Sequence, residues 1–156
     1  MLRRRLLAGL MGPTVLWPVA AAAQSEDDCY DARVSAVVVQ QVPTVLPDMD
    51  DGSIVIRWPW IVDLEVTSVL EGEAPLGAVT VLTVQHSYFR RGLGERPWAL
   101  RRNDLGGFNV VAMGDDLDNP RCEPGSPPAL PFIRPGRGET LESLRLEGLE
   151  YYGDLD

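Results

Sequence analysis

The chain has 156 residues, of which 23 are acidic and 14 are basic, and the formal net charge is −9. Such an acidic surface repels phosphates and anionic lipids, which argues against a nucleic-acid partner. His86 is the only histidine, and this excludes zinc hydrolases of the H-E-x-x-H type.

Residues 1–23 have the pattern of a cleavable export signal. Arg3, Arg4 and Arg5 precede an apolar segment over residues 6–19, and small residues follow directly before Gln24. Glycine and proline interrupt the segment, whereas a membrane-spanning helix needs about 20 apolar residues in a row. An uncleaved anchor is the alternative. We expect an exported protein, periplasmic or secreted, without stable membrane insertion after cleavage. Residues 24–156 would form one β-barrel domain. Because cleavage removes three arginines, the formal net charge would change from −9 to −12.

Two cysteines remain after cleavage, Cys29 near the start and Cys122 near the end. In an oxidising compartment an even number of cysteines predicts a disulfide. This bond would join the first strand to the loop after the last core strand. The alternative is a reactive thiol or a metal ligand, for which no CxxC pair or histidine-rich neighbour is present.

The first predicted strand covers Arg33 to Val42, and a long alternating run follows it. In that run the even positions are apolar, which is typical of a strand with one buried face: Ile54, Ile56, Trp58, Trp60, Val62, Leu64, Val66 and Leu70. Because the run is longer than an ordinary strand, we expect it to bend or break near Pro59.

A turn over residues 71–77 leads to a third strand at Val79 to Val84. Its apolar positions change parity between Val81 and Leu82, and this predicts a β-bulge. Further strands are predicted at Trp98 to Leu100 and at Phe108 to Met113.

A short helix is predicted after Thr140, where it would cap an open end of the barrel, although Gly148 is unfavourable within a helix. The strand count favours a mainly β fold, a small five-stranded OB-like antiparallel barrel with a short C-terminal helix. A small β-sandwich is the alternative.

The long run, the turn after it and the third strand together form a predicted hairpin, and this hairpin resembles that of a known family. Residues 63–72, a turn and residues 77–81 resemble the V-x-x-V-L-K-G … G-x-V-x-V hairpin of secreted OB-fold domains related to netrin modules and tissue inhibitors of metalloproteinases. A first strand led by Cys29 is similar too. The resemblance covers residues 29–113 and implies an OB barrel with a protein-binding or inhibitory role. The family's inhibitors chelate zinc through an N-terminal cysteine, whereas Cys29 would be the sixth residue after cleavage at Ala23, so the inhibitory site is not carried over.

Residues 87–103 form an arginine-rich segment with interleaved aromatic residues, and the short strand predicted at Trp98 to Leu100 lies within it. Arginine forks match carboxylates and phosphates, and aromatic residues are frequent at interfaces. We predict that this segment binds an acidic protein or an anionic ligand. The candidate residues are Arg90, Arg91, Arg96, Trp98, Arg101 and Arg102. The alternative is that these arginines pair with carboxylates of the same chain.

No catalytic set, metal site or cofactor motif is recognised. His86 is interpreted as a structural histidine, and no G-x-S-x-G elbow is present. Acidic clusters at residues 48–51 and 115–119 suit either calcium or solvated turns, without matching the EF-hand pattern. The sequence therefore favours an exported, non-catalytic binding or inhibitory module. The alternative function is an exported hydrolase with a pair of carboxylates at an unidentified site.

Overall fold

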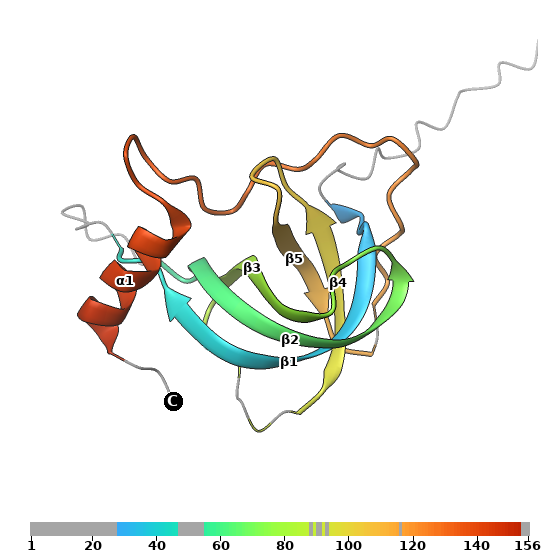
Figure 1. Cartoon of the computed structure of the whole chain (residues 1–156), viewed down its shortest axis with the longest axis horizontal. Coiled ribbons are helices and arrows are strands. Elements are labelled where there is room, and N and C mark those ends of the chain that lie inside the picture. Colours follow the sequence, from blue (N-terminus) through green and yellow to red (C-terminus); the bar gives the residue numbers. More distant parts are fainter. Residues whose placement is uncertain are drawn as a thin grey trace, which may run out of the picture.

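The computed structural model describes residues 28–46, 55–87, 89, 92, 94–115 and 117–153, so the predicted signal lies outside the described residues. These residues form a closed five-stranded barrel and one helix (Figure 1). The elements are β1 (Ala32–Pro43), β2 (Trp58–Gly72), β3 (Gly77–Gln85), β4 (Arg96–Arg102), β5 (Phe108–Met113) and α1 (Leu141–Tyr152). The predicted mainly β class with a C-terminal helix is confirmed, and the barrel is consistent with an OB-like fold.

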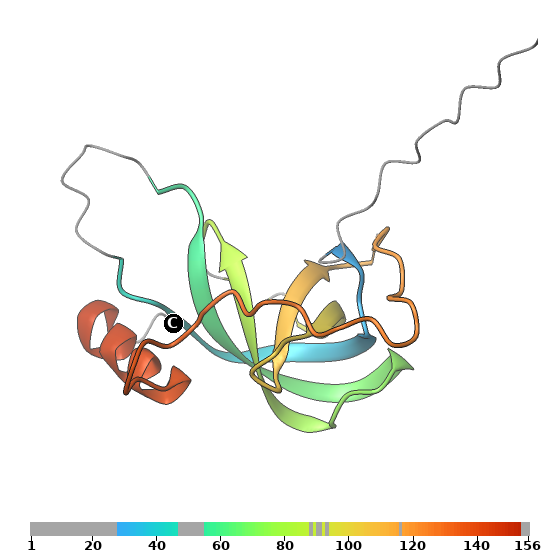
Figure 2. The same cartoon turned by 90° about the horizontal axis from the view of Figure 1, so that it is seen from above.

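The barrel is mixed: the predicted antiparallel pairing is found in four of its five strand pairs, and one pair is parallel. The strand order around the barrel is β1-β2-β3-β5-β4, with β4 pairing back onto β1. Alternating directions cannot be maintained around a closed ring with an odd number of strands, so one pair must be parallel. That pair is β3 with β5, which is joined only at Val81↔Phe108 and Leu82↔Asn109, and the two strands diverge beyond it (Figure 2).

The interior of the barrel confirms the alternating pattern of the long run. Trp60, Val62, Leu64 and Val66 are buried in the main core. β2 starts at Trp58 and continues through Pro59, which pairs with Val84 without a register shift, so the strand is not broken at Pro59. Ile56 precedes the strand and is exposed.

Leu70 was predicted to be in the core, but it is exposed. The pairing of β2 with β1 passes from Val69 to Glu71, so that Leu70 has no partner on β1. Leu70 is therefore a bulge residue, and an earlier bulge at Thr67 has already reversed the parity of β2, so that Val69 packs against the core and Leu70 faces outward.

The β-bulge predicted in the third strand is not present there, because β3 pairs with β2 without a register shift. The shifts lie in the β1–β2 and β4–β5 pairs instead. Leu82 faces the outside of the barrel, where it forms a second apolar cluster with Ile61 and Ile133. The parity change in the sequence thus reflects burial on both faces of β3.

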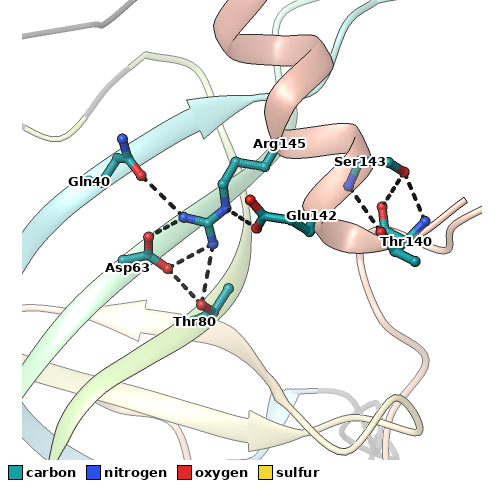
Figure 3. A network of polar contacts seen from close by, with 7 residues as sticks. All are labelled: Gln40, Asp63, Thr80, Thr140, Glu142, Ser143 and Arg145. Carbon is teal, nitrogen blue, oxygen red and sulfur yellow. Dashed lines mark hydrogen bonds and ion pairs between the residues drawn. The ribbon is translucent and has the colours of Figure 1, made fainter.

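Helix α1 lies against the outer wall of the barrel beside the end of β1, rather than capping an open end as predicted (Figure 1). Leu141 and Leu144 pack on the outer apolar cluster. Thr140 caps the helix through its bond from the Ser143 backbone amide. Arg145 connects α1 to three strands (Figure 3): its guanidinium donates to Gln40 of β1, Asp63 of β2 and Thr80 of β3.

Candidate functional site

The predicted disulfide is present: Cys29 and Cys122 are bonded, with their Cα atoms 4.9 Å apart. Two backbone hydrogen bonds accompany it, from Tyr30 N to Pro120 O at 3.0 Å and from Cys122 N to Tyr30 O at 2.9 Å. The segment after β5 is thereby fixed beside the start of β1. The alternative of a reactive thiol or metal ligand was wrong for both cysteines.

A pocket of about 800 Å³ lies next to this disulfide. Its walls come from the start of β1, the turn after β2, the end of β4 and the loop that contains Cys122. The residues that line it are Asp31, Gly72, Glu73, Arg101, Arg102, Arg121, Cys122, Glu123, Pro124, Gly125, Ser126 and Pro128. Its volume is within the range of ligand-binding pockets, but its walls carry more charge than is usual for small-molecule sites.

Arg101 forms the fixed part of the pocket wall. Its side chain is almost completely buried, and its Nη1 donates to Asp31 Oδ2 at 2.7 Å. Its Nη2 donates to Pro127 O, while the backbone N of Arg102 donates to the same Asp31 oxygen at 2.7 Å. Within the described part of the chain, Arg101 Nε is buried without an acceptor. The Arg101–Asp31 pair therefore ties β4, β1 and the disulfide loop together.

Arg102 and Arg121 form the accessible part of the pocket wall. Arg102 Nη2 lies 3.4 Å from Glu73 Oε2, and the two side chains are 52% and 90% exposed. Such an exposed pair contributes little to stability. Arg121 is exposed, and among the described residues its side chain makes no hydrogen bond or ion pair.

Glu71 lies close to this pocket and is held by its neighbours. Its pKa lies below the ordinary value, first because the Tyr30 hydroxyl donates to it at 2.6 Å. Arg33, at 3.2 Å, and the more distant charge of Arg121 act in the same direction. Arg121 thus contributes a positive field, and none of the described residues fixes it in an ion pair.

The predicted arginine segment does not form one surface. The strand predicted at Trp98 to Leu100 is longer, since β4 covers residues 96–102 of the segment, and Arg96 and Arg102 stand at opposite ends of that strand. Six residues at about 3.3 Å each place them about 20 Å apart. Trp98 has no exposed surface: it packs in the main core, and its Nε1 donates to Ala36 O at 3.2 Å. It therefore offers no area to a partner.

Only Arg101 and Arg102 of the six predicted residues line the pocket, and Arg90 and Arg91 lie outside the described residues. The sequence interpretation missed Asp31, Arg121 and Glu123. A signal was available for them, because Asp31 and Arg121 lie within two residues of the two cysteines. The predicted disulfide would have brought them together.

The other candidates are placed as follows. His86 Nδ1–H donates to Ile56 O at 2.6 Å, which agrees with a structural histidine. The acidic cluster at 48–51 and Asp116 lie outside the described residues. Among the residues that are described, no three acidic, histidine or cysteine side chains are grouped so that they could hold a metal ion. Within the same residues, no helix is long and apolar enough to span a membrane.

Fold and site together describe a small mixed β-barrel with a disulfide-bordered, charged pocket. In comparisons with models of protein families, with curated proteins and with solved structures, the chain matches none of them.

Proposed function

We infer that the protein is an exported, non-catalytic binding module whose pocket beside the Cys29–Cys122 disulfide binds an acidic segment of a polypeptide. The observation that carries this proposal is the pocket itself: a ligand-sized hollow in which two accessible guanidinium groups, Arg102 and Arg121, stand on a wall fixed by the buried Arg101–Asp31 pair. The resemblance of the β2–β3 hairpin to netrin-like modules is compatible with this role.

The charges favour a peptide over an apolar ligand. Arg102 is held only by a long contact to the exposed Glu73, so a ligand carboxylate could replace that contact at little cost. Arginine binds a carboxylate through two parallel hydrogen bonds. Glu73 and Glu123 on the same walls would select a segment that also carries a positive or a hydrogen-bond-donating group.

The position of α1 supports a protein partner rather than a nucleic acid. OB barrels bind oligonucleotides on the outer face of their second and third strands. In this chain α1 lies on that face, with Arg145 in contact with Asp63 of β2 and Thr80 of β3 (Figure 3). The net charge of −9 acts in the same direction.

No observation favours the alternative of a carboxylate-dependent hydrolase. A general acid at neutral pH needs a raised pKa. Among the described residues the carboxyl groups with a shifted pKa are Asp63, Glu71 and Glu95, and each pKa is lowered.

The test is an NMR titration of the purified, oxidised protein with a hexaglutamate peptide at low salt. We expect amide shifts at the pocket residues, and weaker binding by about tenfold when Arg102 and Arg121 are both changed to Gln. Arg137→Gln is the matched control, because Arg137 is exposed and does not line the pocket. Unchanged affinity of the double variant would disprove the assignment.

A second set of variants, Arg90→Glu, Arg91→Glu and Arg96→Glu, tests the rest of the predicted segment. If these changes abolish binding and the pocket variants do not, the site lies at the start of β4 instead.

A further inference from the structure

β5 has a free edge. On one side it pairs with β4 over its whole length, whereas on the other side only Phe108 and Asn109 pair with β3. Beyond that point the two strands diverge (Figure 2). Within the described part of the chain, Val110 to Met113 make no backbone hydrogen bond other than those to β4. About half of the N–H and C=O groups of a strand point toward each edge, so among the described residues this side of β5 presents main-chain groups without partners.

The sequence of the free edge lacks two features that usually protect one, charge and proline. Natural edge strands carry charged side chains, proline or a covering element. The sequence of β5 is Phe-Asn-Val-Val-Ala-Met, without a charge or proline, and Val110 to Met113 are half-buried. Another half-paired strand, β1, is covered in contrast: Gln41 bonds both backbone groups of Phe89, and α1 packs against the end of β1.

The facing strand holds a buried amide nitrogen that has no acceptor among the described residues. Gln85 is the last residue of β3, and it stands opposite Trp58 on the inner face of the barrel. Its side chain is only 7% exposed, its Oε1 accepts from the Thr83 hydroxyl at 2.8 Å, and within the described residues its Nε2 has no acceptor. A main-chain carbonyl of an added strand would supply one.

We propose that the free edge of β5, Val110 to Met113, is a docking site for an extended segment of another polypeptide, which adds a strand beside β5 where β3 has diverged. Main-chain hydrogen bonds would provide the affinity, and half-buried Val110 and Met113 would contact alternate apolar side chains of the segment. This site is separate from the pocket beside the disulfide.

Charge indicates what kind of segment fits. The residues directly after β5 are Gly114, Asp115 and Asp116, followed by Asp118, so the partner segment should carry basic residues next to its apolar part. A second copy of this chain would bring together two molecules that each carry a charge of −9, and their repulsion disfavours self-pairing.

The probe for the test is the acetylated peptide VTVTVRR, added to the purified, oxidised protein, with NMR amide exchange as the readout. We expect slower exchange of amides in Val110 to Met113. The same peptide with N-methyl groups on alternate residues should not slow it, because N-methylation removes the donors that strand pairing needs.

A lysine substitution at the edge of β5 provides a second test of the proposal. Val111 is a bulge residue without a partner on β4, because the pairing passes from Val110 to Ala112. Val111→Lys therefore keeps the β4 pairs while placing a charge at the edge. We expect binding of VTVTVRR to weaken by about tenfold. Val39→Lys is the matched control, because Val39 is an exposed bulge residue of β1, and binding should be unchanged.

Three results would overturn the proposal: equal binding of the N-methylated peptide, protection of the pocket at Arg102 and Arg121 instead of β5, or protection of β5 by concentrated protein without peptide. The last result would assign the edge to a second copy of this chain.

Discussion

The guanidinium of Arg145 in α1 donates from Nη2 to Asp63 Oδ1 in β2 at 2.9 Å, and Nη1 contacts the second carboxylate oxygen. Both side chains are largely buried, with 13% and 22% of their surface exposed. Thr80 donates to the same carboxylate at 2.6 Å. The Arg145 guanidinium, with two hydrogen bonds, and the Thr80 hydroxyl together compensate the negative charge of Asp63 on the outer wall of the barrel. The Arg145–Asp63 pair is the main polar link between helix and barrel (Figure 3).

Arg145→Ala is expected to destabilise the protein by about 2–4 kcal/mol, because it leaves Asp63 partly buried without its counter-charge. Urea denaturation with a circular-dichroism readout measures this change. Glu142→Gln is the control: Glu142 is 67% exposed and contacts Arg145 only at 3.3 Å, so its loss should cost under about 0.5 kcal/mol. Equal effects of the two substitutions would contradict the central role of the Asp63 contact.

The same pair predicts a dependence on pH. Desolvation raises the pKa of Asp63, but hydrogen bonds from Arg145 and Thr80, together with the Arg145 charge, outweigh it and hold the pKa below its ordinary value. A carboxyl with a lowered pKa in the folded state contributes stability that is complete above the unfolded pKa of about 3.9 and is lost as the pH falls through the folded value.

The measurement compares wild type with Asp63→Asn from pH 7 to pH 3. The difference in the free energy of unfolding should be constant above about pH 5 and should shrink below about pH 4. A difference that stays constant down to pH 3 would show that Asp63 does not titrate in this range.

Much of the fold could be predicted because strand signals are local. Alternation over Trp60, Val62 and Leu64 reports a buried inner face directly. What lies outside the barrel is not local: Ile61 and Leu82 are buried only because α1 and Ile133 cover them. No alternation within one strand carries that information, so a second buried face was interpreted as a β-bulge.

The candidate site could be predicted less well. Arg96 and Arg102 are close in sequence, but strand geometry separates them, and Trp98 between them is buried in the core. Arg121 and Asp31 are far apart in sequence and are brought to one pocket by the disulfide. Proximity along the chain was thus a poor guide to proximity in space, whereas the covalent link was a good one.

Removing the disulfide should destabilise the protein and loosen the pocket. Cys29 and Cys122 are 93 positions apart, and closing so long a loop restricts the unfolded chain by roughly 4–5 kcal/mol in the entropy model, with about 2–5 kcal/mol typical of measured losses. We expect the double variant Cys29→Ser, Cys122→Ser to lose stability in that range while keeping its β-sheet circular-dichroism signal.

Hydrogen exchange locates the effect of the double variant. Two amides bridge the segments that the disulfide joins: Cys122 N donates to Tyr30 O, and Tyr30 N donates to Pro120 O. Because the first of these belongs to a substituted residue, the amide of Tyr30 is the better reporter. Its exchange should speed up more than that of β2, whose pairs do not depend on the disulfide. Equal acceleration throughout the barrel would show that the bond acts only on global stability.

Gly148 is required by a close contact rather than by a turn. A Cβ at this position would lie 2.3 Å from Pro43 O and 2.7 Å from Val42 Cγ1, so the helix could not keep its present distance from β1. In an isolated helix, alanine is favoured over glycine by about 1 kcal/mol. In this chain we expect Gly148→Ala to destabilise the protein by about 1–3 kcal/mol, because a packed contact must open.

Urea denaturation and amide exchange across α1 measure this effect. Glu147→Ala is the matched control, since Glu147 is the exposed neighbour of Gly148 in the same helix and should change the free energy of unfolding by under about 0.5 kcal/mol. A stabilised Gly148→Ala variant would mean that helix propensity outweighs packing, and that α1 does not lie as close to β1 as the Pro43 contact requires.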